Sequence, residues 1–259
     1  MNSFFLKITS KFPKIRRKLT SVIKLQFVNT VHISIGENCL TDNILQRHNL
    51  KSLTTPYSHG RSNLDYAIIL EKENYSSLLK PDYLKYEKLN NTTVVRNNNV
   101  FSSDPIFSEL HRNGFEFTHH DVISNKSHRE SLKRKIDRLK SLKGKKHFIF
   151  YYHYRVNPNL NLPLLIAKAK IFLAYYQKNR KSCRMVIFTQ ELCDSDADRG
   201  YRINVHSKYI QVIIFKTMQL WEGDDQDVFW ARIDDDLIKM AFTEVHTKGI
   251  TEQGAAANP

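Results

Sequence analysis

The stretch VHISIGENC, residues 31–39, decides the fold because it joins an apolar, β-branched run to a tight turn. Residues 31–35 are typical of a buried strand, Gly36 permits a sharp turn, and a helical pattern follows over residues 40–48. Cys39 therefore falls at the first turn of a helix, where free backbone N–H groups and the helix dipole stabilise a thiolate. This position predicts a nucleophilic cysteine with a lowered pKa.

The other two cysteines lack this setting. Cys183 and Cys193 lie ten residues apart, which is not zinc-finger spacing, and we expect them to be structural. A structural role stays open for Cys39 as well, because free cysteine is among the most buried residue types. Three cysteines without a regular spacing argue against a disulfide-stapled secreted domain, so we expect a cytoplasmic protein.

Length and composition predict one globular domain. The chain has 259 residues, of which 41% are hydrophobic and 11% aromatic. We expect a basic arm over residues 1–28, an α/β domain over residues 29–248 and a disordered tail over residues 249–259. No apolar stretch approaches the roughly 20 residues that a membrane-spanning helix needs.

The N-terminal arm combines basic and apolar side chains. Residues 1–24 contain lysines and arginines but no acidic residue, and the lysines interrupt the apolar core that a signal peptide requires. The pattern favours an amphipathic segment that contacts the inner face of a membrane peripherally, and the alternative is a solvated basic arm.

The second concentration of positive charge lies over residues 126–146 and accounts for much of the net charge of +14. Leu132, Ile136 and Leu139 recur there at helical spacing, which predicts an amphipathic helix with a basic outer face. No helix-turn-helix, aromatic sheet motif or zinc finger accompanies the charge, which argues against a nucleic-acid partner. The electrostatic field of these positive charges would also attract an anionic substrate.

The remaining elements alternate between strands and helices. Helices are expected over residues 64–72, 162–178 and 234–245, strands over 115–117, 147–152, 184–189 and 209–215, a hairpin within 92–101, and a turn-rich loop over 54–63. This alternation predicts an α/β fold in a single three-layer domain with a mostly parallel sheet. Ligands bind such sheets at the carboxyl ends of the strands, where the turn before Cys39 would lie.

A catalytic thiol needs a base, and the sequence Thr-His-His-Asp at residues 118–121 supplies one. Neighbouring strand residues point to opposite faces, so only one of the two histidines can face Cys39. We favour His120 over His119, with Asp121 holding the imidazole ring. The alternative is that the histidines bind a metal ion together with Asp121 or His153.

Further site residues are expected around this pair. The Asn38 side chain and the backbone N–H of Cys39 would form an oxyanion hole, and Asn38 also suits a helix cap. The turn and the following loop supply candidate substrate contacts, which are Gly36, Ser58, His59 and Arg61.

An acidic stretch over residues 221–236 offers a different function. Asp234 and Asp236 would bind Mg²⁺ or Mn²⁺ in a metal-dependent transferase of bacterial surface-polysaccharide synthesis. The simpler interpretation is an acidic loop followed by helix N-terminal charge. The cysteine mechanism itself needs no cofactor.

The segments 33–39, 50–56, 117–121 and 147–152 together resemble a bacterial family described as papain-like cysteine peptidases. The resemblance spans residues 31–241 and implies that Cys39 is the nucleophile and that one histidine of the pair is its partner. Many members carry Pro-Phe-Asp-Trp where this chain has Pro-Tyr-Ser-His at residues 56–59, so that aspartate is absent here.

The turn is also similar to that of serine esterases with a Gly-Asp-Ser nucleophile. Acyl transfer is common to these families. Papain-like enzymes lack a parallel sheet, whereas this sequence predicts one, so the prediction is not restricted to peptidase activity. We therefore predict a thiol-dependent hydrolase or acyltransferase that acts on an ester, thioester or amide of an acyl, peptide or glycan substrate. A non-catalytic, membrane-associated module is the remaining alternative.

Overall fold

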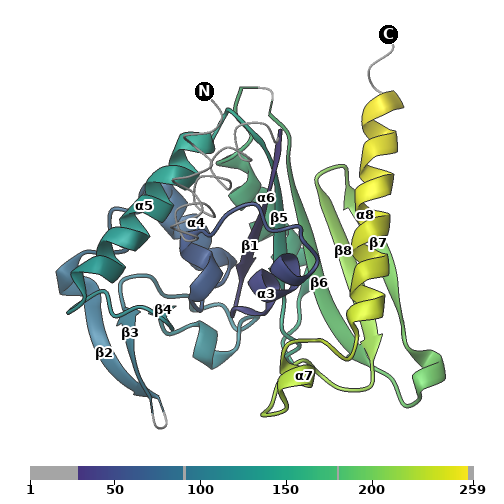
Figure 1. Ribbon diagram of the computed structural model, residues 1–259, viewed down its shortest axis with the longest axis horizontal. Coiled ribbons are helices and arrows are strands. Elements are labelled where there is room, and N and C mark those ends of the chain that lie inside the picture. The colour runs from purple at the N-terminus through teal and green to yellow at the C-terminus, as the bar shows by residue number, and fades with distance from the viewer. Residues whose placement is uncertain (1–28, 90–91, 180, 256–259) are drawn as a thin grey trace, which may run out of the picture.

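A five-stranded sheet forms the centre of the molecule (Figure 1). The computed structural model describes residues 29–89, 92–179 and 181–255. In sheet order the strands are β1 (Thr30–Gly36), β5 (His147–His153), β6 (Cys183–Leu192), β8 (Ile210–Thr217) and β7 (Gly200–Ser207). Neighbouring strands pair in parallel except β7, which pairs antiparallel with β8. The predicted α/β fold with a mostly parallel sheet is confirmed.

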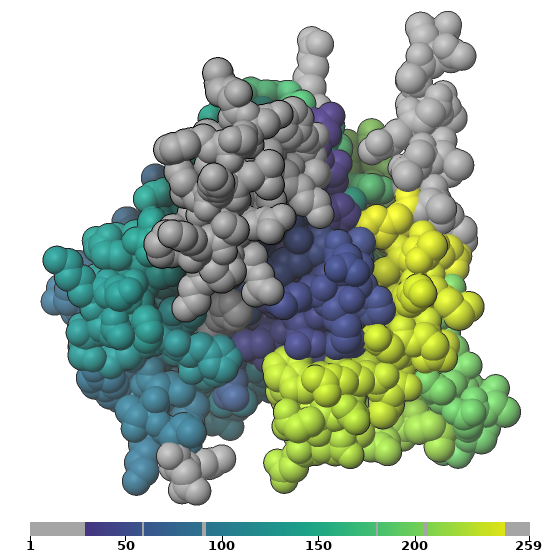
Figure 2. Space-filling model, viewed as in Figure 1, coloured from purple at the N-terminus to yellow at the C-terminus, as the bar shows by residue number. Residues whose placement is uncertain are grey.

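Helices cover both faces of this sheet. Along β5, Phe148, Phe150 and Tyr152 pack with α4 (Leu64–Lys72), α5 (Lys126–Leu142) and α6 (Leu162–Ala174). Ile149 and Tyr151 pack with α3 (Leu40–Arg47) and α8 (Asp235–Ala255) on the opposite face. Figure 2 shows α8, in yellow, against the blue segment that carries α3. This arrangement confirms the three layers, and it explains why β5 is apolar at successive positions.

Asparagine caps fix the start of three helices. The side chain of Asn63 accepts a hydrogen bond from Tyr66 N at α4. In the same way, the side chain of Asn125 accepts a hydrogen bond from His128 N at α5, and that of Asn161 accepts one from Leu164 N at α6. Each cap satisfies a backbone donor that the helix leaves unpaired, so local sequence sets these boundaries.

A second, three-stranded sheet lies beside the first (Figure 1). It contains β2 (Leu84–Leu89), β3 (Thr92–Asn97) and β4 (Phe115–Phe117), all antiparallel. The prediction of a hairpin within residues 92–101 is wrong, because residues 92–97 form the single strand β3, which pairs with β2 and β4. The polar, largely exposed sequence of β2 gave no strand signal.

Short helical turns complete the chain. They are η1 (Pro56–His59), η2 (Pro81–Tyr83), η3 (Glu109–His111), η4 (Asp196–Asp198) and α7 (Gln226–Phe229). Helix α8 continues to Ala255, beyond the expected end of the domain at residue 248. The expected arm over residues 1–28 lies outside the described residues. Within the described part of the chain, no helix has the length and apolar character needed to span a membrane.

Candidate active site

Cys39 lies between the end of β1 and the start of α3. The Asn38 side chain accepts a hydrogen bond from Leu40 N at 3.0 Å, and Cys39 O accepts one from Asn43 N at 3.0 Å. A Cβ atom at Gly36 would lie 3.1 Å from Thr41 Oγ1, so glycine lets the turn approach the helix closely. The strand, turn and helix predicted around Cys39 are confirmed.

His119 reaches Cys39 from the second sheet. Its segment leaves β4, where Glu116 forms a reciprocal backbone bridge with Arg61. Cys39 Sγ lies 3.6 Å from His119 Nε2, within hydrogen-bond distance for sulfur. The fold thus brings together a thiol and an imidazole that are 80 residues apart in sequence.

The preference for His120 as the residue facing Cys39 is wrong. His120 Nε2 lies 3.3 Å from Lys135 Nζ on α5, and its ring packs edge-on against His128 with the centroids 5.4 Å apart. Both histidines follow the end of β4 at Phe117, so the alternation of strand side chains does not apply to them, and the sequence could not show which histidine faced Cys39.

Asp121 has a local structural role. Its carboxylate accepts hydrogen bonds from the backbone N–H groups of Ile123 and Ser124, from the Ser124 hydroxyl and from the Tyr86 hydroxyl. These bonds lower the pKa of Asp121, the Ser124 hydroxyl contributing most. They fix the turn before α5, whereas we predicted that Asp121 holds the catalytic imidazole.

The electrostatic surroundings of Cys39 oppose ionisation of its thiol. Burial, together with the negative charges of Asp42 and Glu116, raises the pKa of Cys39 to about 11. Arg61 and Lys51 act in the opposite direction but do not outweigh it. The predicted lowering of the cysteine pKa is therefore wrong for this resting site, and the thiol is neutral at pH 7.

Asn38 has an unused hydrogen-bond donor next to Cys39. While Oδ1 accepts a hydrogen bond from Leu40 N, Nδ2 has no hydrogen-bond partner among the described residues, although the residue is only 9% exposed. A buried donor without a partner costs free energy and is uncommon in folded proteins. This donor fits the predicted oxyanion hole. The N-cap residue of α3 is Cys39 and not Asn38, so the Asn38 side chain precedes the predicted cap position and accepts only from Leu40 N.

The candidate substrate contacts have different positions. Ser58 is fully buried, and its hydroxyl accepts a hydrogen bond from Thr55 N at 3.0 Å in the capping box of η1. This burial does not fit the predicted substrate contact. Arg61 is partly exposed and interacts electrostatically with Cys39. The side chain of His59 lies outside the described part of the structure.

A buried polar cluster behind the turn was not predicted. Glu37 accepts a hydrogen bond from the Tyr152 hydroxyl at 3.0 Å, and its other oxygen lies 3.2 Å from His111 Nδ1. All three side chains are buried. The sequence contained one signal for it, namely an acidic residue inside an otherwise buried strand-to-helix turn, which requires a partner.

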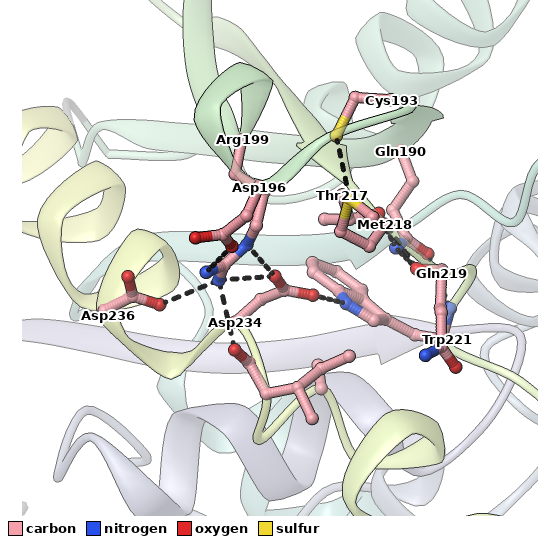
Figure 3. Close-up of polar contacts among 12 residues, drawn as sticks. Gln190, Cys193, Asp196, Arg199, Thr217, Met218, Gln219, Trp221, Asp234 and Asp236 are labelled. Carbon is pink, nitrogen blue, oxygen red and sulfur yellow. Dashed lines mark hydrogen bonds and ion pairs between the residues drawn. The ribbon is translucent and has the colours of Figure 1, made fainter.

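The acidic stretch forms an ion-pair network (Figure 3). Arg199 Nη2 lies 2.8 Å from Asp234 Oδ1 and 3.2 Å from Asp236 Oδ1, and Trp221 Nε1 donates to Asp234 Oδ2 at 2.8 Å. In the described parts of the chain, no group of three or more His, Cys, Asp or Glu residues is arranged to hold a metal ion. Asp234 and Asp236, which were predicted as alternative metal ligands, bind Arg199 instead. The indole of Trp221 also holds the buried carboxylate of Asp234.

Comparison with known proteins gives one match. The sequence model of a protein family described as "putative papain-like cysteine peptidase" matches residues 30–190, which include the Cys39 turn, the histidine pair and the first three strands of the large sheet. No curated protein and no solved structure matches the chain.

Proposed function

The chain belongs to the family described as "putative papain-like cysteine peptidase", and from this premise we propose that it is a thiol-dependent acyl hydrolase or acyltransferase. The observation that carries the proposal is the 3.6 Å approach of Cys39 Sγ to His119 Nε2. A nucleophile and a base within reach of each other are the minimum set for covalent acyl transfer. The substrate carbonyl would belong to an ester, thioester or amide.

The neutral thiol determines how the reaction starts. Cys39 Sγ attacks the carbonyl carbon while its proton passes to His119 Nε2, so that a sulfur–carbon bond forms without a preformed thiolate. Asn38 Nδ2 and the backbone N–H of Cys39 would donate to the resulting oxyanion. Collapse breaks the bond to the leaving group, which takes the proton from His119.

The second half of the reaction regenerates the thiol. Water or another acceptor attacks the acyl thioester on Cys39 and gives a proton to His119, and the sulfur then leaves and recovers that proton. Water as acceptor makes the protein a hydrolase, and an alcohol or amine makes it a transferase. The mostly parallel sheet favours testing small esters and thioesters before peptides.

The test measures acylation of Cys39 in the full chain. A p-nitrophenyl ester and an acetyl thioester are each mixed with the protein, the reaction is quenched in acid, and peptide mass spectrometry locates the acyl group. We expect acylation at Cys39, about 10²- to 10⁴-fold slower in His119→Ala and within about tenfold of wild type in His120→Ala. Wild-type turnover by Cys39→Ala, or equal losses in both histidine variants, would overturn the proposal.

A further inference from the structure

The acidic side chains nearest Cys39 already have cationic partners. Asp42 lies 2.5 Å from Lys51 Nζ and accepts a hydrogen bond from Ser34 Oγ at 2.9 Å. Glu116 lies 3.0 Å from Arg96 Nη2, and both of these side chains are 1% exposed. The first pair is balanced in charge, whereas Arg96 is shared between two carboxylates, because its Nε also lies 2.7 Å from Glu87 Oε2. Further cations near Cys39 therefore decide the net charge of the site.

Arg61 is the first such cation. Its backbone pairs with Glu116, and Ser62 N donates to Gly36 O at 3.3 Å, so the segment lies between the Cys39 turn and the strand leading to His119. Nε of Arg61 is 3.5 Å from Glu116 Oε1, so Arg61 and Arg96 together face the carboxylates of Glu116 and Glu87. The terminal guanidinium nitrogens make no hydrogen bond to another described residue, and the side chain is 30% exposed.

Lys135 is the second cation and approaches from α5. Its Nζ lies 3.3 Å from His120 Nε2, beside the histidine pair, and it forms no ion pair with a carboxylate among the described residues. Burial and the nearby charge of Lys51 lower the pKa of Lys135. The charge of Asp42 acts in the opposite direction without forming an ion pair with Lys135. An anion placed beside the half-buried ammonium would offset the cost of burying it.

We propose that Arg61 and Lys135 form an anion-binding part of the site, which holds a carboxylate or phosphate of the substrate next to the reacting carbonyl. The inference rests on the proposed function, in which Cys39 is the nucleophile. A guanidinium offers paired donors to a planar or tetrahedral anion, and an ammonium adds a point charge. The protein therefore selects anionic acyl donors over neutral ones of the same size.

The test compares two alkylating reagents that differ in charge. Iodoacetate is anionic and iodoacetamide is neutral, and with each reagent Cys39 Sγ forms a bond to carbon as iodide leaves and the thiol proton passes to the buffer. Mass spectrometry gives both rates for Cys39 in the folded chain and in the chain unfolded in urea. Both reagents react with the same thiol, so the intrinsic nucleophilicity of Cys39 cancels in the ratio of the two rates. The ratio therefore measures the positive charge around Cys39, and it does so even if His119 has no catalytic role.

We expect the iodoacetate to iodoacetamide ratio at Cys39 to be roughly threefold to tenfold higher in the folded chain, and to fall with added salt. Arg61→Gln and Lys135→Gln should each lower the ratio. Lys133→Gln is the matched control, because it removes the same charge from another face of α5, where Lys133 lines a separate cavity of about 530 Å³. A folded ratio equal to the unfolded one, equal effects of all three variants, or a Cys39 inert to both reagents would overturn the proposal.

Discussion

Cys39 Sγ lies 3.6 Å from His119 Nε2, yet the pKa of this thiol is raised to about 11. The two facts are compatible when His119 acts as a general base on a neutral thiol. In that state the imidazole accepts the thiol proton only as the sulfur–carbon bond forms. A preformed thiolate–imidazolium pair would instead need a lowered thiol pKa.

The first prediction concerns the pH dependence of Cys39 alkylation. Because burial and the charge of Asp42 raise the pKa of Cys39 to about 11, the rate with iodoacetamide should still be rising at pH 9. Asp42→Asn removes the charge that raises this pKa most, so the whole profile should shift to lower pH. Asp82→Asn, at an exposed position in η2, is the charge-matched control. A wild-type midpoint below pH 8 would contradict the raised pKa.

The second prediction separates the two roles of Asn38. Asn38→Ala removes both the acceptor for Leu40 N at the start of α3 and the free amide donor, whereas Asn38→Ser keeps a short acceptor for Leu40 N. Loss of the hydrogen bond to Leu40 N should lower the free energy of unfolding by about 1 kcal/mol in the alanine variant alone. Loss of an oxyanion donor should slow acylation of Cys39 by about 10²- to 10³-fold in both variants. Urea unfolding and the acylation assay measure the two effects independently, and wild-type acylation by Asn38→Ser would remove Nδ2 from the mechanism.

The sequence could predict those features of the fold and the site that depend on residues close together in the chain. The apolar run before Gly36 and the helical pattern after Cys39 are local, so the nucleophile turn and the parallel strands followed from periodicity. The raised pKa of Cys39 was not accessible in this way. It depends first on burial, which only the folded chain sets, then on the nearby charge of Asp42, and also on Glu116, a residue 77 positions farther along the chain.

The choice between the two histidines also depends on distant contacts. His119 faces Cys39 because β4 pairs with Arg61 and α5 places Lys135 beside His120. Nothing in the sequence Thr-His-His-Asp distinguishes its two imidazoles. The strand β2 was missed for a related reason, since it is stabilised by pairing with β3 and its own residues are mostly polar and exposed.

The third prediction concerns the close contact that aligns the histidine strand. A Cβ atom at Gly60 would lie 2.7 Å from Glu116 O and 2.9 Å from the Phe115 ring, so Gly60→Ala must push β4 away. We expect roughly 1 to 3 kcal/mol of lost stability. Acylation of Cys39 should also slow, because His119 follows the displaced strand.

The control for this contact is Gly200→Ala in β7, where a Cβ atom would meet nothing within 4 Å. Both variants lose a glycine from extended backbone, so only the contact with β4 distinguishes them. Urea unfolding and the acylation assay compare the two. Equal stability and equal acylation in Gly60→Ala and Gly200→Ala would show that the contact does not align the site.

The last prediction concerns acid stability and His153. This histidine is buried, its ring stacks on Phe188 with the centroids 5.1 Å apart, and its Nδ1 has no hydrogen-bond partner among the described residues. Burial, with the charges of Arg155 and His111, lowers the pKa of His153 to about 3. The unfolded chain, with an ordinary imidazole pKa of about 6.5, therefore binds a proton that the folded chain does not, and stability falls as the pH falls from about 6.5 to about 3.

His153→Phe keeps an aromatic ring against Phe188 and removes the titrating group. The loss of unfolding free energy between pH 7 and pH 4 should then be smaller than in the wild type by roughly 3 kcal/mol. His32, whose pKa is lowered to about 4 chiefly by burial, retains part of the acid sensitivity in the variant, so some loss remains. Urea unfolding at pH 7, 5.5 and 4 measures the difference. The same acid sensitivity in wild type and His153→Phe would mean that His153 gains its proton in the folded chain as readily as in the unfolded one, through a partner or a water molecule at Nδ1.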